Sequence, residues 1–125
     1  MMPFVPARPV VIVEAVRVAD ARDALSWRTV PGEGIALWTG EEAADVLALV
    51  AALPHGEPAR CFSPGYGVRL HTDDEVVREI AFCFACNRAR VVDPGGRGRS
   101  IAFDGESAPA RELLRRFRAA DPHVT

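Results

Sequence analysis

The sequence predicts a single α+β domain with a mostly antiparallel sheet and two main helices packed on it. Its 125 residues match the usual size of one domain, and 49% of them are apolar, which is enough to fill one core. Several segments carry the β-branched or alternating pattern of strands, and two carry apolar residues at helical spacing. A run of strands between the two helices favours antiparallel pairing. We therefore expect residues 1–125 to form one domain.

Strand signals precede the first helix. Residues 9–18 are apolar and β-branched, which favours an extended conformation. Residues 24–30 alternate weakly, as a second strand would. Residues 31–34 contain a proline and two glycines and predict a turn. Residues 35–38 predict either a short strand or the approach to a helix.

Two segments predict amphipathic helices. Thr39 and Glu42 have the spacing of a capping box, so both side chains can bond free N–H groups at a helix start. The Pro-His-Gly sequence at 54–56 ends that helix. Ser107 can cap the last helix. The apolar positions at helical spacing are Ala43, Val46, Leu47, Val50 and Leu53 in the first helix, and Ala110, Leu113, Leu114 and Phe117 in the last.

The polar turn at residues 72–75 predicts a hairpin of two strands. If pairing is regular from this turn, Leu70 faces Val77. The same register places Cys61 opposite Cys86, so one hairpin brings all three cysteines to one end of the ladder. The chain then continues through a strand at 76–83, a further strand at 88–92, a glycine-rich loop at 93–98 and residues 99–103.

Composition excludes several classes of function. All fifteen basic residues are arginine, so neither a Schiff-base lysine nor a P-loop lysine exists. The net charge of −2 gives no general attraction to nucleic acid or to an anionic membrane. No apolar run reaches the length of a membrane span, and the N-terminal residues do not have the pattern of a signal peptide. We expect a cytoplasmic protein.

The three cysteines are the most distinctive chemistry in the chain. They are Cys61 and the pair Cys83 and Cys86, in a C-x-x-C spacing. They could bind a soft metal such as zinc, form a disulfide, cycle as a redox pair or lie buried as inert thiols. As a metal site they need a fourth ligand, for which His55 is better placed than His71, which lies beside the hairpin turn.

Residues in one strand that are three apart point to opposite faces of the sheet. Cys83 and Cys86 can therefore meet only if the chain turns between them. Asn87 favours such a turn because asparagine tolerates the left-handed conformation. A thioredoxin-like C-x-x-C begins a helix after a strand, whereas this pair follows a strand without a helix start, which argues against that redox mechanism.

Residues 60–92 resemble part of a group of small, uncharacterised bacterial proteins. The matching segments are Cys61-Phe62-Ser63-Pro64-Gly65-Tyr66-Gly67-Val68-Arg69 and Ile80-Ala81-Phe82-Cys83-Phe84-Ala85-Cys86-Asn87. That group shares a C-x-P-x-H-G segment, a C-F-x-C segment and a short amphipathic helix at the end. Tyr66 stands where the group has histidine. The resemblance implies no established activity.

The sequence thus predicts a small non-enzymatic binding or interaction protein, with a cysteine cluster that holds a structural metal such as zinc. The predicted metal ligands are Cys61, Cys83, Cys86 and His55. The alternative is a thiol-dependent redox or soft-metal-handling protein that uses the same cysteines. Two tryptophans and an apolar N-terminal strand permit a homodimer, and we expect a protein partner rather than nucleic acid.

Overall fold

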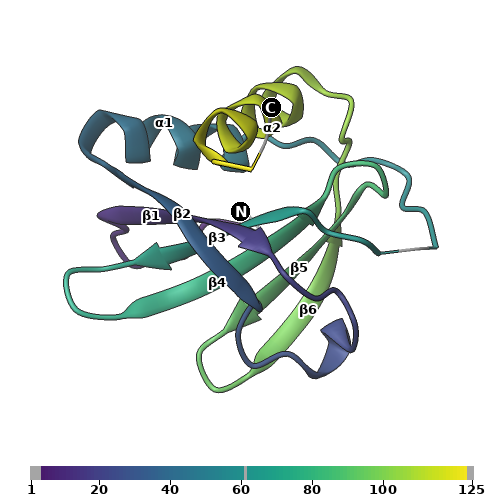
Figure 1. Cartoon of the computed structure of the whole chain (residues 1–125), viewed down its shortest axis with the longest axis horizontal. Coiled ribbons are helices and arrows are strands. Elements are labelled where there is room, and N and C mark those ends of the chain that lie inside the picture. Colours follow the sequence, from purple (N-terminus) through teal and green to yellow (C-terminus); the bar gives the residue numbers. More distant parts are fainter. Residues whose placement is uncertain (1–3, 61, 124–125) are drawn as a thin grey trace.

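The computed structural model describes residues 4–60 and 62–123 and has a six-stranded sheet at its centre (Figure 1). The strands are β1 (Ile12–Val18), β2 (Gly32–Thr39), β3 (Tyr66–His71), β4 (Val76–Cys83), β5 (Arg88–Asp93) and β6 (Arg97–Ala102). The helices are α1 (Gly40–Ala51), α2 (Ala108–Ala120) and the short 3₁₀ helix η1 (Ala24–Ser26). The strand order is β2-β1-β3-β4-β5-β6, and every pair of neighbours is antiparallel. The predicted fold class is confirmed.

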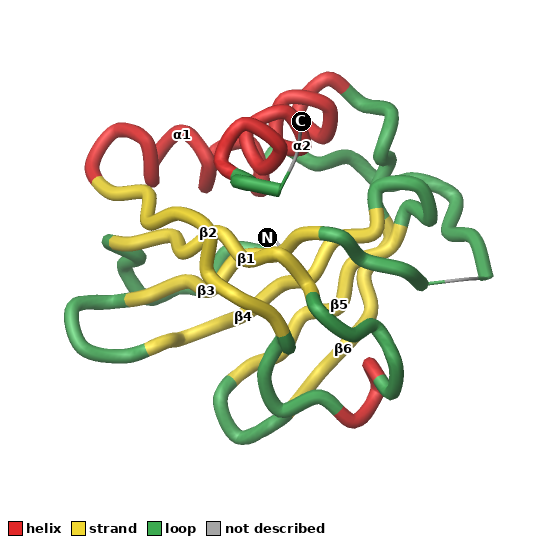
Figure 2. The backbone as a smooth tube through the Cα atoms, in the orientation of Figure 1, coloured by secondary structure: helices red, strands yellow, loops and turns green. Residues whose placement is uncertain are grey.

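Both long helices lie on the same face of the sheet (Figures 1 and 2). Residues that alternate along each strand point toward these helices, and together they form the main core. Its centre is aromatic: Phe82 on β4 contacts Phe4, Phe103 and Phe117 at ring-centroid distances of 6.1, 5.8 and 6.2 Å. Phe117 belongs to the apolar stripe of α2, which the sequence predicted.

A loop covers part of the opposite face of the sheet. Residues 19–31 connect β1 to β2 and contain η1, seen below the sheet in Figure 2. Trp27 and Val30 from this loop pack on Ala81 and Val92 of the sheet, forming a second and smaller cluster. The sheet therefore has a large core under the helices and a small one under the loop.

The predicted strand at 24–30 is wrong. Residues 24–26 form η1, and Asp23 before it takes a left-handed conformation with φ of 54°. The weak alternation of residue types along 24–30 does not match the burial, because Trp27 and Val30 are buried three residues apart while Arg28 and Thr29 between them are exposed. The predicted turn at 31–34 is also wrong, since residues 32–34 belong to β2.

The hairpin between β3 and β4 forms around the predicted turn, but its register differs by one residue. His71 pairs with Val76, whereas Leu70 pairs with Arg78 instead of Val77. A bulge between Leu70 and His71 causes the shift. Irregular pairing next to a turn cannot be deduced from the length of the turn alone.

The helices begin at the expected residues but are capped differently. The Ser107 side chain accepts a hydrogen bond from the Ala110 backbone N–H at 3.4 Å, as predicted. Thr39 precedes α1 but makes no side-chain cap hydrogen bond. Gly40, the first residue of α1, has φ of 56°, whereas the capping box requires a helical conformation there.

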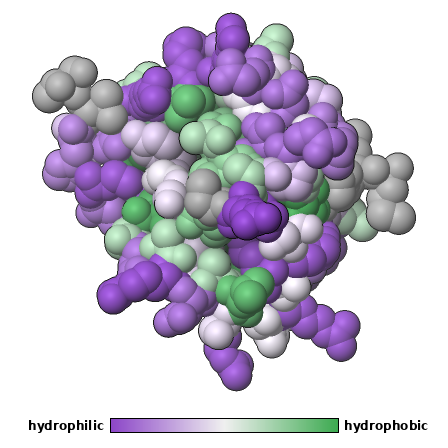
Figure 3. All heavy atoms as spheres, turned by 90° about the vertical axis from the view of Figure 1, so that its right-hand side faces the viewer, coloured by the Kyte–Doolittle hydropathy of each residue, from purple (hydrophilic) through white to green (hydrophobic). Residues whose placement is uncertain are grey.

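The surface carries many charged side chains, and in the view of Figure 3 hydrophobic side chains gather toward the middle of the face. Large hydrophobic side chains that are well exposed include Leu25 at 80% and Leu37 at 67%. Within the described residues, no helix is long and apolar enough to cross a membrane. Both tryptophans are buried, so neither offers a surface for a second copy of the chain.

Candidate functional site

The C-x-x-C pair closes the tight turn between β4 and β5, where Cys83 and Cys86 are joined by a disulfide. Asn87 takes the left-handed conformation, with φ of 56°, as the sequence predicted for a turn at this point. Both cysteines are only 2% exposed. The chain reverses between them, which resolves the conflict that a regular strand would impose on residues three apart.

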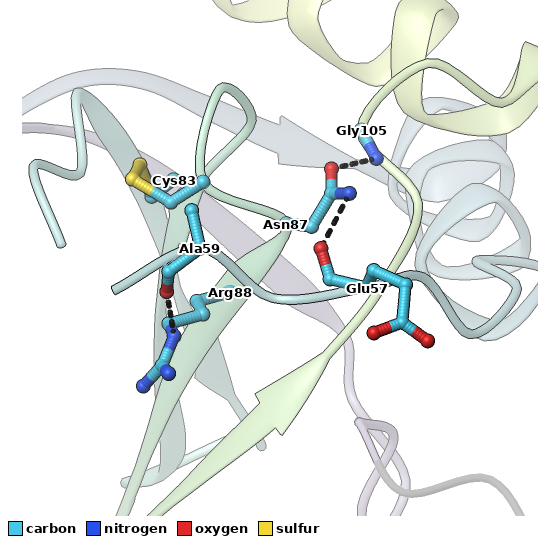
Figure 4. Close-up of a disulfide and its surroundings, with 7 residues drawn as sticks. Glu57, Ala59, Cys83, Asn87, Arg88 and Gly105 are labelled. Atoms are coloured by element: carbon cyan, nitrogen blue, oxygen red, sulfur yellow. Dashed lines mark hydrogen bonds between the residues drawn. A yellow bond between two sulfur atoms is a disulfide. The ribbon is translucent and has the colours of Figure 1, made fainter. Parts of the chain in front are cut away.

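The segment at residues 57–59 runs beside this turn and is bonded to it (Figure 4). The Ala59 N–H donates to the Cys86 carbonyl at 2.8 Å. The Asn87 side chain donates to the Glu57 carbonyl at 3.0 Å and accepts from the Gly105 N–H at 2.8 Å. Asn87 therefore joins three separate segments of the chain next to the disulfide.

The predicted metal ligands are only partly brought together. Cys83 and Cys86 lie side by side, but Cys61 lies outside the described residues. His55 is exposed and lies two residues before Glu57, which bonds the turn. Within residues 4–60 and 62–123, no three His, Cys, Asp or Glu side chains cluster in a way that could hold a metal ion. The predicted metal site stays a prediction, since it concerns reduced cysteines and includes Cys61.

A cavity of about 460 Å³ lies on the sheet face opposite the two long helices. The segment 23–26, which includes η1, lines one side of it. Arg88 and Arg90 of β5, Ser100 of β6 and the aromatic ring of Phe62 line the rest. The cavity thus combines apolar surface with two arginines.

The loop that lines this cavity is held by a buried carboxylate. Glu79 on β4 is 8% exposed and accepts hydrogen bonds from the Thr29 hydroxyl at 2.7 Å and the Val30 N–H at 3.0 Å. Arg69 on β3 donates to the Val30 carbonyl at 2.9 Å and pairs with Glu79 at 3.1 Å. Because these groups sit in the sheet, they fix the loop against it.

Arg69 is itself fully compensated. Besides Glu79 it pairs with Glu14 on β1 at 3.2 Å, and Glu14 also lies 3.2 Å from the His71 ring. The strand register explains this group, because Glu14, Arg69 and Glu79 are successive cross-strand neighbours on β1, β3 and β4. A partly buried cation flanked by two carboxylates keeps most of the electrostatic stabilisation that water would provide.

Arg90 on β5 is buried without such partners. It is 9% exposed, and its buried Nε makes no hydrogen bond with any described residue. Within the same residues its terminal nitrogens make only long hydrogen bonds, to the Ser100 hydroxyl and to the Leu25 carbonyl, both at 3.4 Å. In the part of the chain that the structure describes, no carboxylate lies within ion-pair distance of Arg90.

Sequence reasoning did not identify this cavity. The alternation in β5 does place Arg88 and Arg90 on one face, opposite Ala89 and Val91. The sequence contains this signal, because a strand at residues 88–92 puts both arginines on one face. The loop that covers the face was not predictable in the same way, because residues 24–30 resemble a strand.

Comparisons with protein-family models, with curated proteins and with solved structures each gave no match for this chain. The resemblance of residues 60–92 to small bacterial proteins therefore stays a prediction. The turn and the cavity are the two places where the described residues offer chemistry that bears on function.

Proposed function

We propose that this protein is a non-enzymatic binding module whose ligand occupies the cavity between the segment 23–26, β5 and β6. The observation that carries the proposal is the composition of the lining, which has an apolar wall around a buried arginine with no carboxylate of the described residues within ion-pair distance. Ligand sites in proteins combine a mainly apolar surface with a few convergent polar groups, and the volume of about 460 Å³ is in their usual range.

The described lining favours binding over catalysis. It contains Ser26 and Ser100 but neither histidine nor cysteine. A serine nucleophile needs a neighbouring base that a third group orients, and Ser100 instead contacts Arg90. The disulfide-bonded cysteines lie outside this lining and are almost wholly buried.

The proposal predicts that a charge on the cavity wall weakens binding. Leu25 is 80% exposed, so Leu25→Asp costs little stability but removes apolar contact with a ligand. We expect roughly tenfold weaker binding of small organic molecules in a heteronuclear NMR titration. The resonances that shift in the native protein are expected to be those of residues 23–26, 88–90 and 100.

Leu37→Asp is the matched control for this variant. Leu37 is 67% exposed and lies on β2, outside the cavity. The Leu37→Asp variant must bind the same small molecules with the affinity of the native protein. Equal loss in both variants, or no shift at the cavity with any compound of a mixed panel, contradicts the proposal.

The cysteines favour a second candidate, a soft-metal or thiol-dependent role. The observation that favours it is the direct approach of Cys83 and Cys86, which could chelate one ion after reduction of their bond. Cys61 and His55 complete the ligand set predicted from the sequence. This role requires thiolates, because a disulfide sulfur is a poor ligand.

Native mass spectrometry of freshly reduced protein incubated with zinc tests this second candidate. We expect a metal-sized mass excess that disappears on denaturation and in Cys83→Ser. Cys-to-Ser variants at the other two positions and His55→Ala then identify the remaining ligands. A reduced protein that takes up no zinc contradicts the metal role. Turnover of disulfide substrates that is lost in Cys83→Ser contradicts the non-enzymatic proposal.

A further inference from the structure

We propose that the ligand of this cavity is a monocarboxylate with an apolar chain, and that Arg90 binds its carboxylate. This inference rests on the proposed function and extends it by naming the chemistry of the ligand. Two arginines on one face of the sheet, the partly buried Arg69 and the buried Arg90, differ in the partners that surround them.

Arg69 and Arg90 provide an internal comparison. Arg69 is flanked by the carboxylates of Glu14 and Glu79 at 3.2 and 3.1 Å. Among the residues that the structure describes, Arg90 has only the two hydrogen bonds of 3.4 Å, and its buried Nε has no acceptor. Burying a cation without a nearby negative charge is strongly unfavourable. Two carboxylates supply that negative charge at Arg69, whereas no described carboxylate supplies it at Arg90. An anionic ligand in the cavity would supply it.

The net charge of the lining favours a monoanion. Arg88 and Arg90 contribute two positive charges, and Asp23 on the facing segment contributes one negative charge. The sum is a single positive charge, which matches one carboxylate. A phosphate dianion would exceed it and would face stronger repulsion from Asp23 than a monoanion does. The planar guanidinium also matches a carboxylate in a two-pronged hydrogen-bond geometry.

The apolar part of the lining defines the rest of the ligand. Leu25 is 80% exposed although it belongs to a segment held against the sheet. The Phe62 ring lines the same cavity and contacts Trp27 at a centroid distance of 6.3 Å. A hydrocarbon chain between Leu25 and Phe62 would remove apolar surface from water while its carboxylate reaches Arg90.

Gly98 on β6 leaves space that the Arg90 guanidinium occupies. A Cβ added at Gly98 would lie 2.6 Å from Nη2 and 3.0 Å from Cζ of Arg90. Gly98 and Arg90 are therefore in van der Waals contact, and a larger residue must push the guanidinium aside. Because that group ends a flexible side chain, Gly98→Ala is expected to move it without disturbing the strand.

The test is an NMR titration of the full chain with four probes: hexanoate, hexanamide, hexylammonium and inorganic phosphate. We expect hexanoate to bind at the cavity and to shift the Arg90 guanidinium resonances, since its terminal nitrogens gain an acceptor better placed than those at 3.4 Å. The neutral and cationic analogues are expected to bind roughly 10- to 100-fold more weakly, which is the usual effect of a charge-assisted hydrogen bond. Phosphate is expected to bind no better than these analogues.

Three variants test the role of Arg90. Arg90→Met should weaken hexanoate to the level of hexanamide and raise the midpoint of thermal unfolding, because it removes an uncompensated buried charge. Gly98→Ala should weaken hexanoate while the charge remains. Arg118→Met, which removes the same charge from α2 on the other face of the sheet, must leave the affinity unchanged.

The possible failures are distinguishable. If hexanamide or hexylammonium binds at the cavity as tightly as hexanoate, or phosphate binds more tightly, the monocarboxylate assignment is overturned while the binding module stands. If Arg90→Met leaves hexanoate binding intact, the role of Arg90 is overturned. If none of the four probes shifts a cavity resonance, both this inference and the proposed function fail.

Discussion

Individual side chains in this protein acquire their properties from a few specific partners. Tyr66 on β3 stacks on Phe117 of α2 with ring centroids 5.2 Å apart and an interplanar angle of 4°. Its hydroxyl donates a hydrogen bond to Asp121 at 2.7 Å. Burial and this hydrogen bond raise the pKa of Tyr66 to about 12. The pKa of Asp121 is lowered, chiefly because its carboxylate accepts a hydrogen bond from the His123 N–H.

The raised pKa of Tyr66 predicts a stability that depends on alkaline pH. An unfolded tyrosine ionises near pH 10. The neutral hydroxyl therefore contributes stability that is fully present below about pH 10 and is lost as the pH rises through about 12. Tyr66 is the single tyrosine of the chain, so phenolate absorbance reports it alone. We expect the native absorbance transition near pH 12.

Tyr66→Phe is the control for this titration. It removes the phenolate signal and the hydrogen bond to Asp121 but keeps the ring on Phe117. Urea unfolding near neutral pH should then show a loss of about 1 kcal/mol. A native absorbance transition near pH 10 would show that the hydroxyl is not held as described.

At the scale of elements, the sequence predicts where the chain has regular structure better than how one segment meets another. The boundaries of β4 were predicted correctly, since residues 76–83 form one uninterrupted strand. The register of its partner β3 was not, because the bulge beside His71 depends on local packing. The loop at 19–31 was misread because its weak alternation of residue types does not match the burial, which falls on Trp27 and Val30, three residues apart. Its attachment depends on Glu79, which lies about 50 residues away in the sequence.

The two long helices give a matched pair of capping predictions. Ser107→Ala removes the hydrogen bond from the Ala110 N–H and should cost about 1 kcal/mol of folding free energy. Thr39→Ala removes a side chain that makes no cap bond, so it should cost clearly less. Chemical denaturation of the two variants measures both values. Equal losses would mean that Thr39 caps α1 in solution.

In the whole molecule, the main hydrophobic core and the candidate site lie on opposite faces of one sheet. The helices and the aromatic cluster around Phe82 bury one face. The small cluster around Trp27 and the arginine cavity occupy the other. The sequence predicted the first arrangement from its apolar periodicity. The cavity was not predicted because its lining comes from a loop, two strands and the segment of Phe62, which are far apart in the sequence.

Reduction of the disulfide is a test at this scale. Cys83 and Cys86 close a loop with a sequence separation of only 3, so the chain-entropy effect of the bond is about 2 kcal/mol. We expect reduction to lower the free energy of unfolding by about that amount without unfolding the sheet. Circular dichroism and urea titrations with and without reductant measure it, with Cys83→Ala as the control that reductant should not affect. A complete loss of structure on reduction would contradict this expectation.

The separation of the two faces has an evolutionary consequence. Substitutions at Leu25, Phe62 or Arg88 alter the cavity lining, and none of these side chains is fully buried in the main core. Such changes can accumulate with little penalty to folding, because the helix-covered face carries most of the buried apolar surface. Related chains are then expected to preserve residues such as Phe82 and Leu113 while their cavity linings diverge. The fold would thus be retained among related chains while their ligand specificity changes.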